Sequence, residues 1–221
     1  MNHPGYDNFP PGFFDRSDPS DDASFYGVER LVTHIDDGAI AAVGDLYAEL
    51  NLDGEVLDLM SSWVSHFATA PRSLAVLGMN AGELEANPQA VERIVHDLNR
   101  NPELPFADAS FDDVVCCVSV DYLTRPLEVF AEVARVLRPG GRFVCTFSNR
   151  CFPTKAIQGW LMLDDRQRMD LVGIYFELTE RFGPATKQTR VASGFGDPLL
   201  AVWAERATVE RATTERETEE A

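Results

Sequence analysis

Lysine is almost absent from this sequence, which holds only Lys155 and Lys187 among its 221 residues. Acidic residues number 36 against 19 basic ones, so the formal net charge is -17 at pH 7. Such an acidic surface repels phosphate backbones, and we expect no nucleic-acid partner. Acid excess with few lysines is also typical of halophilic proteins, which remain soluble in concentrated salt. An ordinary acidic bacterial protein is the alternative.

Long apolar runs and targeting signals are absent too. No apolar stretch is long enough to span a membrane, and no basic segment followed by an apolar run opens the chain. We therefore expect a cytoplasmic protein with no membrane partner.

The cysteines are Cys116, Cys117, Cys145 and Cys151, and they show neither zinc-type spacing nor a disulfide framework. The sequence thus predicts reduced cysteines and no metal site.

Length and composition predict one main domain. A chain of 221 residues with 45% hydrophobic content can bury one sizeable core, and we place it at residues 24–206. Residues 1–23 are rich in Pro, Gly and Asp, which predicts a weakly ordered leader. Phe13 and Phe14 within it, with Phe25 and Tyr26 just after it, suggest packing at the sheet edge or closure over a ligand. Residues 207–221, rich in Glu, Thr and Arg, predict an acidic, disordered tail.

Strand-length apolar runs alternate with segments of helical spacing. The stretch at 55–65 is a buried strand that ends near Asp58 and breaks into small polar residues. A short helix ending near Pro71 is predicted to follow. Further strands are expected at 74–79, 91–96, 114–120 and 142–147. Helices are expected at 39–50, at 83–87, from 126 onward, at 154–163 and at 166–178. A hairpin is expected at 183–191 and 198–204. The alternation predicts an α/β, doubly wound, mostly parallel sheet.

Several motifs resemble those of the class I S-adenosylmethionine-dependent methyltransferases, of the type 11 kind. They are Val56-Leu-Asp-Leu59, Leu104-Pro-Phe106, Ser110-Phe-Asp112 and the run from Val129 to Phe143 that ends in Leu-Arg-Pro-Gly-Gly-Arg-Phe. The resemblance implies a seven-stranded Rossmann-like sheet with an antiparallel C-terminal hairpin strand. It also implies S-adenosylmethionine as cofactor and methyl transfer as activity. We expect a small-molecule acceptor, because no separate macromolecule-binding domain is visible; the oligomeric state is open.

The first motif departs from the family pattern. Its usual three glycines are replaced by Met60, Ser62 and Val64, and side chains there enter space that the cofactor normally shares with backbone. Asn80 stands where an acid commonly holds the ribose hydroxyls. Similar bacterial and plant members share this glycine-poor form. The departures leave an alternative open, a non-catalytic protein of this fold that binds a nucleoside-like ligand or a protein partner.

The resemblance also implies the site residues. Asp58 corresponds to the acid of the first motif, and Asp97 to the residue near the adenine amino group. The predicted cofactor-binding residues are Asp58, Met60, Ser61, Ser62, Asn80, Ala81, Asp97, Leu98 and Cys117. The catalytic candidates are Asp121, Tyr122 and Asn149, with helix capping, core packing and loop hydrogen bonding as their alternative roles. Displacement at a sulfonium depends mainly on alignment, so a missing acid–base cluster does not exclude an enzyme. A dinucleotide enzyme is disfavoured because no Gly-x-Gly-x-x-Gly follows the first strand.

Overall fold

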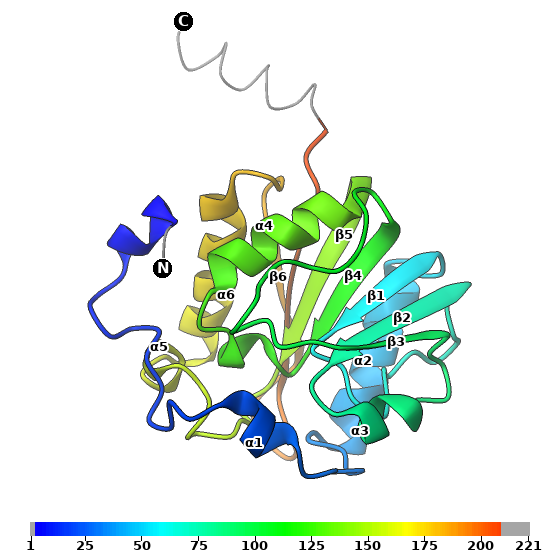
Figure 1. Ribbon diagram of the computed structural model, residues 1–221, viewed down its shortest axis with the longest axis horizontal. Helices are drawn as coiled ribbons and strands as arrows, with labels where there is room; N and C mark the ends of the chain where they lie inside the picture. Colours follow the sequence, from blue (N-terminus) through cyan, green and yellow to red (C-terminus); the bar gives the residue numbers. More distant parts are fainter. Residues whose placement is uncertain (1–2, 209–221) are drawn as a thin grey trace, which may run out of the picture.

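The structure is a computed structural model and describes residues 3–208. Its centre is a seven-stranded sheet with the strand order β3-β2-β1-β4-β5-β7-β6 (Figure 1). Strands β1 to β5 are parallel, and β7 runs antiparallel to both β5 and β6. The strands are β1 (Glu55–Leu59), β2 (Ser73–Gly78), β3 (Glu92–Val95), β4 (Phe111–Cys117), β5 (Leu137–Phe147), β6 (Thr186–Val191) and β7 (Leu199–Glu205). The predicted doubly wound sheet with a C-terminal antiparallel hairpin is confirmed.

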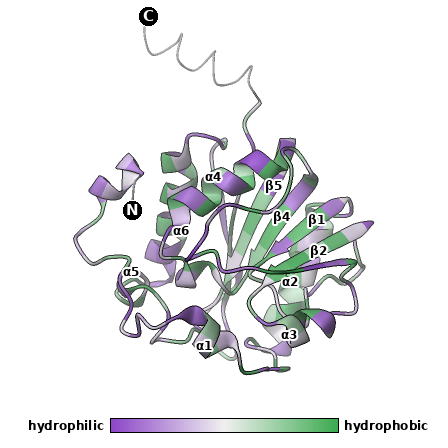
Figure 2. Ribbon diagram, in the orientation of Figure 1, coloured by the Kyte–Doolittle hydropathy of each residue, from purple (hydrophilic) through white to green (hydrophobic). Residues whose placement is uncertain are grey.

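Helices cover both faces of the sheet, and each face has its own core (Figures 1 and 2). The helical elements are η1 (Pro4–Asn8), α1 (Asp22–Tyr26), α2 (Asp37–Glu49), α3 (Ala81–Glu85), η2 (Val120–Tyr122), α4 (Pro126–Val136), α5 (Gln158–Leu161) and α6 (Asp165–Thr179). Helices α4 and α6 pack on one face and α2 on the other. Alternate side chains of β1 enter opposite cores, Leu57 with α4 and Val56 with α2. Burial on both faces explains the continuous apolar runs of the central strands.

Local signals account for several helix ends. Asp36 caps α2 by accepting a hydrogen bond from the Ala39 amide at 2.9 Å. Pro126 opens α4 as predicted, since a proline in the first turn loses no helical hydrogen bond. That helix ends at Val136, and β5 begins at once with the Leu-Arg-Pro-Gly-Gly sequence, where Gly140 has a φ of +81°. The left-handed residue Gly140 therefore lies near the start of β5 and does not cap the end of α4.

The predicted helix between β1 and β2 is wrong. Residues 60–72 form an irregular connection, and its polar backbone groups are satisfied from outside. The Ser61 amide donates to the Leu77 carbonyl at 2.8 Å, while Asn87 donates to the Ser62 carbonyl and Gln89 to the Phe67 carbonyl. Partners outside the connection thus satisfy backbone groups that a helix would pair internally, so the connection remains irregular.

Residues 3–23, which we expected to form a weakly ordered leader, pack against the domain. Phe14 is buried in the core next to α6, and the Phe13 carbonyl accepts a hydrogen bond from the Gly159 amide at 2.8 Å. Arg16 forms an isolated antiparallel bridge with Ile157. Aromatic packing against α5 and α6 offsets the ordering cost that the Pro- and Gly-rich composition suggested.

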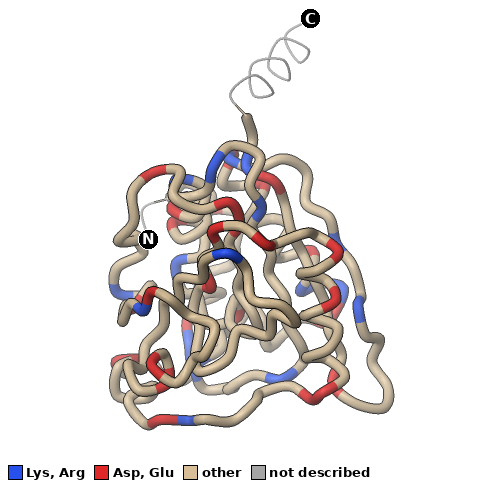
Figure 3. The backbone as a smooth tube through the Cα atoms, turned by 90° about the vertical axis from the view of Figure 1, so that its right-hand side faces the viewer, with Lys and Arg blue, Asp and Glu red and all other residues tan. Residues whose placement is uncertain are grey.

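Two sequence expectations concern the surface and the ends. Acidic residues are spread along the described part of the chain, with basic residues between them (Figure 3). Within residues 3–208, no helix combines the length and the apolar character needed to cross a membrane. The predicted tail at 207–221 lies almost wholly outside the described residues, since 209–221 are not described.

Candidate functional site

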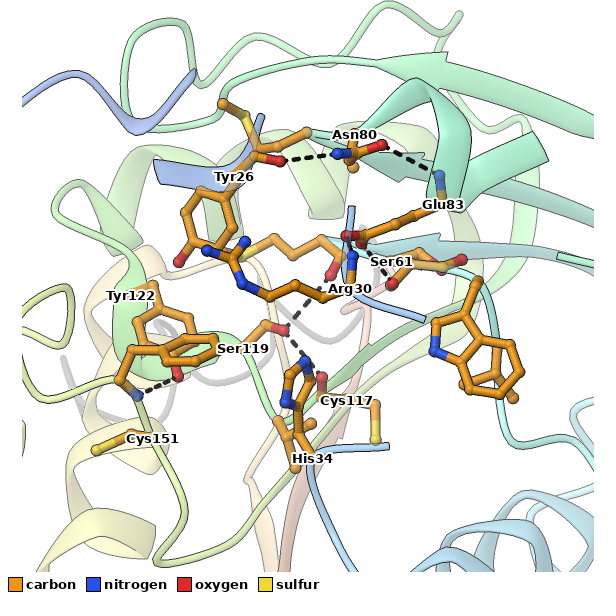
Figure 4. Close-up of a pocket in the computed structure, with 18 of the residues that line it drawn as sticks. Tyr26, Arg30, His34, Ser61, Asn80, Glu83, Cys117, Ser119, Tyr122 and Cys151 are labelled. Atoms are coloured by element: carbon orange, nitrogen blue, oxygen red, sulfur yellow. Dashed lines mark hydrogen bonds between the residues drawn. The ribbon is translucent and has the colours of Figure 1, made fainter. Parts of the chain in front are cut away.

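A cavity of about 500 Å³ opens at the carboxyl ends of β1, β2 and β4. Ligand sites of open α/β sheets lie at this edge, because strand ends and the loops after them converge there. Its floor consists of residues that follow those strands, and its far wall is the loop at 149–153 after β5. Residues 16–34, which we call the cover segment, close the remaining side. Figure 4 shows side chains from all these segments turned toward one another.

The turn after β1 keeps a glycine-like backbone without glycine. Met60 has a φ of +57°, a left-handed conformation that L residues adopt rarely. Its side chain packs against the core on the α4 face and lines the cavity. Gly78 of β2 makes the close approach possible, because an added Cβ there would lie 2.2 Å from the Ser61 carbonyl oxygen. The close contact between the turn and β2 thus depends on a glycine in β2 and not on a glycine within the turn.

Asp58 stabilises this turn from below. Its carboxylate accepts a hydrogen bond from the Ser61 hydroxyl at 2.7 Å, and Ser65 is a second side-chain partner. Burial raises the pKa of Asp58 to about 7, and the two serines lower it only in part. The carboxyl group lines the cavity with no ion-pair partner among the described residues. It therefore carries a proton for part of the time near neutral pH.

Asn80 lines the cavity, but both ends of its carboxamide are engaged. The side-chain oxygen caps α3 by accepting from the Gly82 and Glu83 amides at 3.0 and 3.1 Å. The side-chain nitrogen donates to the Tyr26 carbonyl at 2.9 Å. Asn80 therefore links α3 to the cover segment. Ala81, predicted beside it, is exposed and is not part of the cavity wall.

Asp97 and Leu98 lie at the end of β3 and line the cavity as expected. Asp97 Oδ1 accepts hydrogen bonds from the Asn99 and Arg100 amides at 2.9 and 3.2 Å, which fixes the turn. Oδ2 takes part in neither bond. Leu98 is buried and supplies an apolar surface next to the carboxylate. This pair can contact both an exocyclic amino group and the face of a planar base.

The residues after β4 form the floor of the cavity. Cys117 lines it with a thiol whose pKa burial raises to about 12, so it is a poor nucleophile. Val118 follows with a φ of +47°, which is rare for a β-branched residue. Together with Met60 and His66, it makes three cavity residues with a left-handed backbone. Such backbone outliers gather at functional sites.

The three catalytic candidates are not brought together. Asp121 is buried away from the cavity wall, and burial raises its pKa to about 8. The Tyr122 hydroxyl lines the cavity but accepts a hydrogen bond from the Phe152 amide at 2.8 Å. Asn149 is exposed on the rim. Only Tyr122 and Asn149 can thus contact a ligand in the cavity.

Sequence reasoning missed several residues of the site, among them four with charged or imidazole side chains. Arg30 and His34 come from the cover segment, Glu83 from the first turn of α3, and His66 from the connection after β1. Glu83 accepts hydrogen bonds from the Arg30 amide and from the Ser62 hydroxyl, each at 2.7 Å. Partial desolvation lowers the pKa of His34 and of His66. No residue pattern signalled this cluster, because it unites segments distant in sequence.

The buried Lys155 fixes the cover segment to the domain. Its ammonium lies 3.2 Å from Asp22 and 3.1 Å from Asp18, and donates to the Ser20 carbonyl at 2.9 Å. Arg16 also pairs with Asp22 at 2.8 Å. Burial raises the pKa of Asp22, but the hydrogen bonds from Arg16 and Asn99 outweigh it, so that pKa lies below its ordinary value. Sequence reasoning read the rarity of lysine only as a surface property and assigned Lys155 no buried role.

The strand order, the C-terminal hairpin and the cavity at the strand ends define a class I methyltransferase fold. Residues 53–145 match the family model described as a methyltransferase domain. This part of the chain is thus similar to the methyltransferase domain family, in agreement with the sequence resemblance.

Curated relatives match over part of their length. The chain is 41% identical over 80 residues to a demethylmenaquinone methyltransferase of Mycobacterium sp. (strain KMS), which is 34% of this chain and 34% of the relative. It is 35% identical over 106 residues to the ubiquinone/menaquinone biosynthesis C-methyltransferase UbiE of Desulfotalea psychrophila, which is 42% of this chain and 40% of the relative. The chain thus covers well under two thirds of these relatives.

Solved structures share the fold at low identity. A 1,6-didemethyltoxoflavin-N1-methyltransferase of Burkholderia thailandensis, solved with its substrate and S-adenosylhomocysteine, has a TM-score of 0.56 and 16% identity, with 78% of this chain and 80% of that chain covered. A SAM-dependent methyltransferase of Aquifex aeolicus has a TM-score of 0.54 and 14% identity, with 77% and 92% covered. At this identity, the likeness concerns the fold alone.

Proposed function

We propose that this protein binds S-adenosylmethionine in the cavity and transfers its methyl group to a small-molecule acceptor. The observation that carries the proposal is the position of the cavity, which joins the ends of β1, β2 and β4 in a methyltransferase sheet. Its volume of about 500 Å³ lies in the range of small-molecule sites. The relatives that act on quinones make an aromatic acceptor the first class to test.

The residues present fit the cofactor at two of three places. Asp97 and Leu98 offer a free carboxylate oxygen and an apolar face for the adenine. At the turn after β1, Met60 keeps the left-handed backbone, and the buried Asp58 holds Ser61 in place. The ribose end differs from the family, because Asn80 has both ends of its carboxamide engaged with protein backbone.

The chemistry needs alignment more than a dedicated base. The bound cofactor would supply an electrophilic methyl group on a sulfonium. The chain's task is to hold the acceptor in line with that methyl and to exclude water, and such positioning can account for roughly 7–11 kcal/mol of barrier reduction. The cover segment excludes solvent, while the floor at 117–119 and the loop at 149–153 form the surface against which an acceptor would lie.

The direct test is titration calorimetry of the purified protein with S-adenosylmethionine and S-adenosylhomocysteine. We expect both to bind, with Asp97→Ala weakening binding roughly ten- to hundredfold because a hydrogen bond to a charged group is lost. Glu103→Ala, an exposed acid outside the cavity, is the control. Turnover would then be followed with isotope-labelled methyl donor and a soluble naphthohydroquinone.

A wild-type protein that binds neither form of the cofactor would refute this proposal. It would favour the non-catalytic alternative, in which the cavity receives another nucleoside-like ligand or a protein segment. The observation that favours this alternative is that both ends of the Asn80 carboxamide are already hydrogen-bonded to the protein backbone.

A further inference from the structure

The carboxylates around the cavity are largely engaged by the protein itself. Asp22 is paired with Arg16 and Lys155. Both oxygens of Glu83 accept hydrogen bonds from the protein. Asp58 is buried with a pKa of about 7 and has serine partners only. None of these carboxylates forms an ion pair with a cation of the cavity wall.

Arg30 is such a cation. It lies in the cover segment, and its backbone amide is fixed by Glu83 at 2.7 Å. Its guanidinium donates to the Val28 carbonyl at 3.1 Å and to the Phe25 carbonyl at 2.9 Å. Within residues 3–208, no carboxylate forms an ion pair with it, although the chain has nearly twice as many acidic as basic residues. A guanidinium has five N–H donors, so these two bonds leave donors to spare.

Aromatic rings hold the guanidinium in place. It lies over the Phe25 ring at 4.8 Å from the centroid and 5.8 Å from that of Phe152. Figure 4 shows it extended across the cavity toward the side where Tyr26 and Tyr122 lie. The Tyr26 hydroxyl is buried and has no hydrogen-bond partner among the described residues. A guanidinium that is stacked, oriented and unpaired is suited to bind a carboxylate in its plane.

Two other basic side chains of the cavity wall add little positive charge at this place. His34, at 5.3 Å from the Phe152 ring, adds no lasting positive charge at neutral pH because desolvation lowers its pKa. Arg150 on the rim is paired with Asp197 at 3.0 Å. Arg30 is thus the guanidinium in the cavity wall whose charge no carboxylate of the described residues neutralises. Closing the cover segment over a ligand would strengthen its attraction for an anion, because water would be excluded.

We propose that Arg30 is the carboxylate-binding residue of this cavity, and that its partner is a ligand carboxylate delivered beneath the cover segment. Two sources share this chemistry: the amino-acid end of the cofactor, and a carboxylate on the methyl acceptor. The inference rests on the proposed function, since both sources are ligands of a methyltransferase site.

The first arm of the test compares S-adenosylhomocysteine with 5′-methylthioadenosine, which lacks the amino-acid carboxylate. If Arg30 binds the cofactor, the preference of the wild type for S-adenosylhomocysteine should fall roughly ten- to hundredfold in Arg30→Met. The second arm compares salicylate with salicylamide on protein saturated with S-adenosylhomocysteine. If Arg30 binds the acceptor, the cofactor preference stays constant, and the preference for salicylate over salicylamide disappears in Arg30→Met.

Two controls separate charge from folding. Arg30→Lys keeps the charge and should retain part of the carboxylate preference. Arg168→Met removes a guanidinium that also lies over an aromatic ring, Trp160 at 5.5 Å, but outside the cavity wall, and it should change neither preference. If Arg30→Met and Arg30→Lys lose the carboxylate preference to the same extent and both have a lower Tm, Arg30 has a structural role and the inference is overturned.

The outcomes distinguish this inference from the proposed function. If the wild type binds S-adenosylhomocysteine but Arg30→Met changes neither the cofactor preference nor the salicylate preference, the inference is refuted and the proposed function stands. Wild type that binds no cofactor form but prefers salicylate through Arg30 refutes the proposed cofactor and supports the carboxylate site. Absence of binding in both arms refutes both.

Discussion

The Lys155 ammonium lies 3.2 Å from the Asp22 carboxylate, and neither side chain has appreciable exposed surface. A buried pair of this kind joins the cover segment to the segment after β5 across more than half of the sequence. Its neighbours Asp18 and Ser20 satisfy the remaining donors of the ammonium. The pair therefore fixes the cover segment, which closes one side of the candidate site, to the folded domain.

Lys155→Met should destabilise the protein by roughly 1–3 kcal/mol, because the Ser20 carbonyl loses its donor while Asp22 keeps Arg16 as a partner. It should also expose the leader to protease first. Lys187→Met is the matched control, since the other lysine forms an exposed pair with Asp170 at 2.7 Å, which is expected to contribute about 0–1 kcal/mol. Denaturant unfolding and limited proteolysis measure both variants. Equal stability and equal cleavage of the two would contradict the role of Lys155.

Asn80→Asp restores the acid that the family commonly has at this position, yet we expect it to weaken the protein. The new carboxylate keeps the α3 cap but cannot donate to the Tyr26 carbonyl, which then faces an acceptor oxygen. The loss should be about 1–3 kcal/mol, the cost of an unsatisfied buried group. Denaturant unfolding measures it, and calorimetry should show no gain in cofactor affinity. Tighter S-adenosylhomocysteine binding with unchanged stability would show that the amide is free to turn.

Met60→Gly should leave stability within about 1 kcal/mol of wild type, because relief of the left-handed backbone offsets the lost packing of the side chain. Since the turn already has a glycine-like φ, cofactor binding should stay equal or weaken. A thermal melt and a titration with S-adenosylhomocysteine test the two parts. A marked gain in affinity would show that the Met60 side chain obstructs the site.

Stability should decrease as the pH rises from about 5 to 9. Burial raises the pKa of Asp113 to about 6, of Asp58 to about 7 and of Asp121 to about 8. A carboxyl whose folded pKa is raised stabilises the fold most below its unfolded pKa, and this contribution is lost as the pH rises through the folded value. Carboxyls with lowered pKa, such as Asp36, act in the opposite direction only at more acidic pH.

The variant that isolates this effect is Asp121→Asn, which cannot ionise. It should be more stable than wild type at pH 9, by on the order of a few kcal/mol, and the difference should shrink as the pH falls toward about 4. Unfolding in denaturant across the pH range gives the comparison. An unchanged slope with pH in the variant would show that Asp121 does not titrate in this range.

The net charge of -17 predicts that salt stabilises this protein. Molar KCl reduces the Debye length to about 3 Å, which screens the mutual repulsion of surface acids. The Tm should therefore rise between dilute buffer and molar KCl. Sucrose of matched viscosity is the control for general solvent effects. A Tm that stays flat with KCl would refute a halophile-like surface.

The sequence by itself determined the sheet and most of the helices that cover it. Strands buried on both faces need long apolar runs, and capping residues such as Asp36 and the Pro126 start signal act within one turn of the chain. These are local or strictly periodic signals, so they could be read from the sequence without a partner. The strand ends at Asp58 and Asp97 followed from the same periodicity, and both residues line the cavity.

Only the tertiary structure decided how the site is closed. The connection after β1 is irregular because Asn87 and Gln89, more than twenty residues away, satisfy its carbonyls. Lys155 meets Asp22 across 133 positions, and Arg30 reaches the cavity because Glu83 fixes its backbone. Such contacts have no period and no spacing in the sequence. They arise from the free energy of satisfying buried polar groups, which depends on which segments the folded sheet brings together.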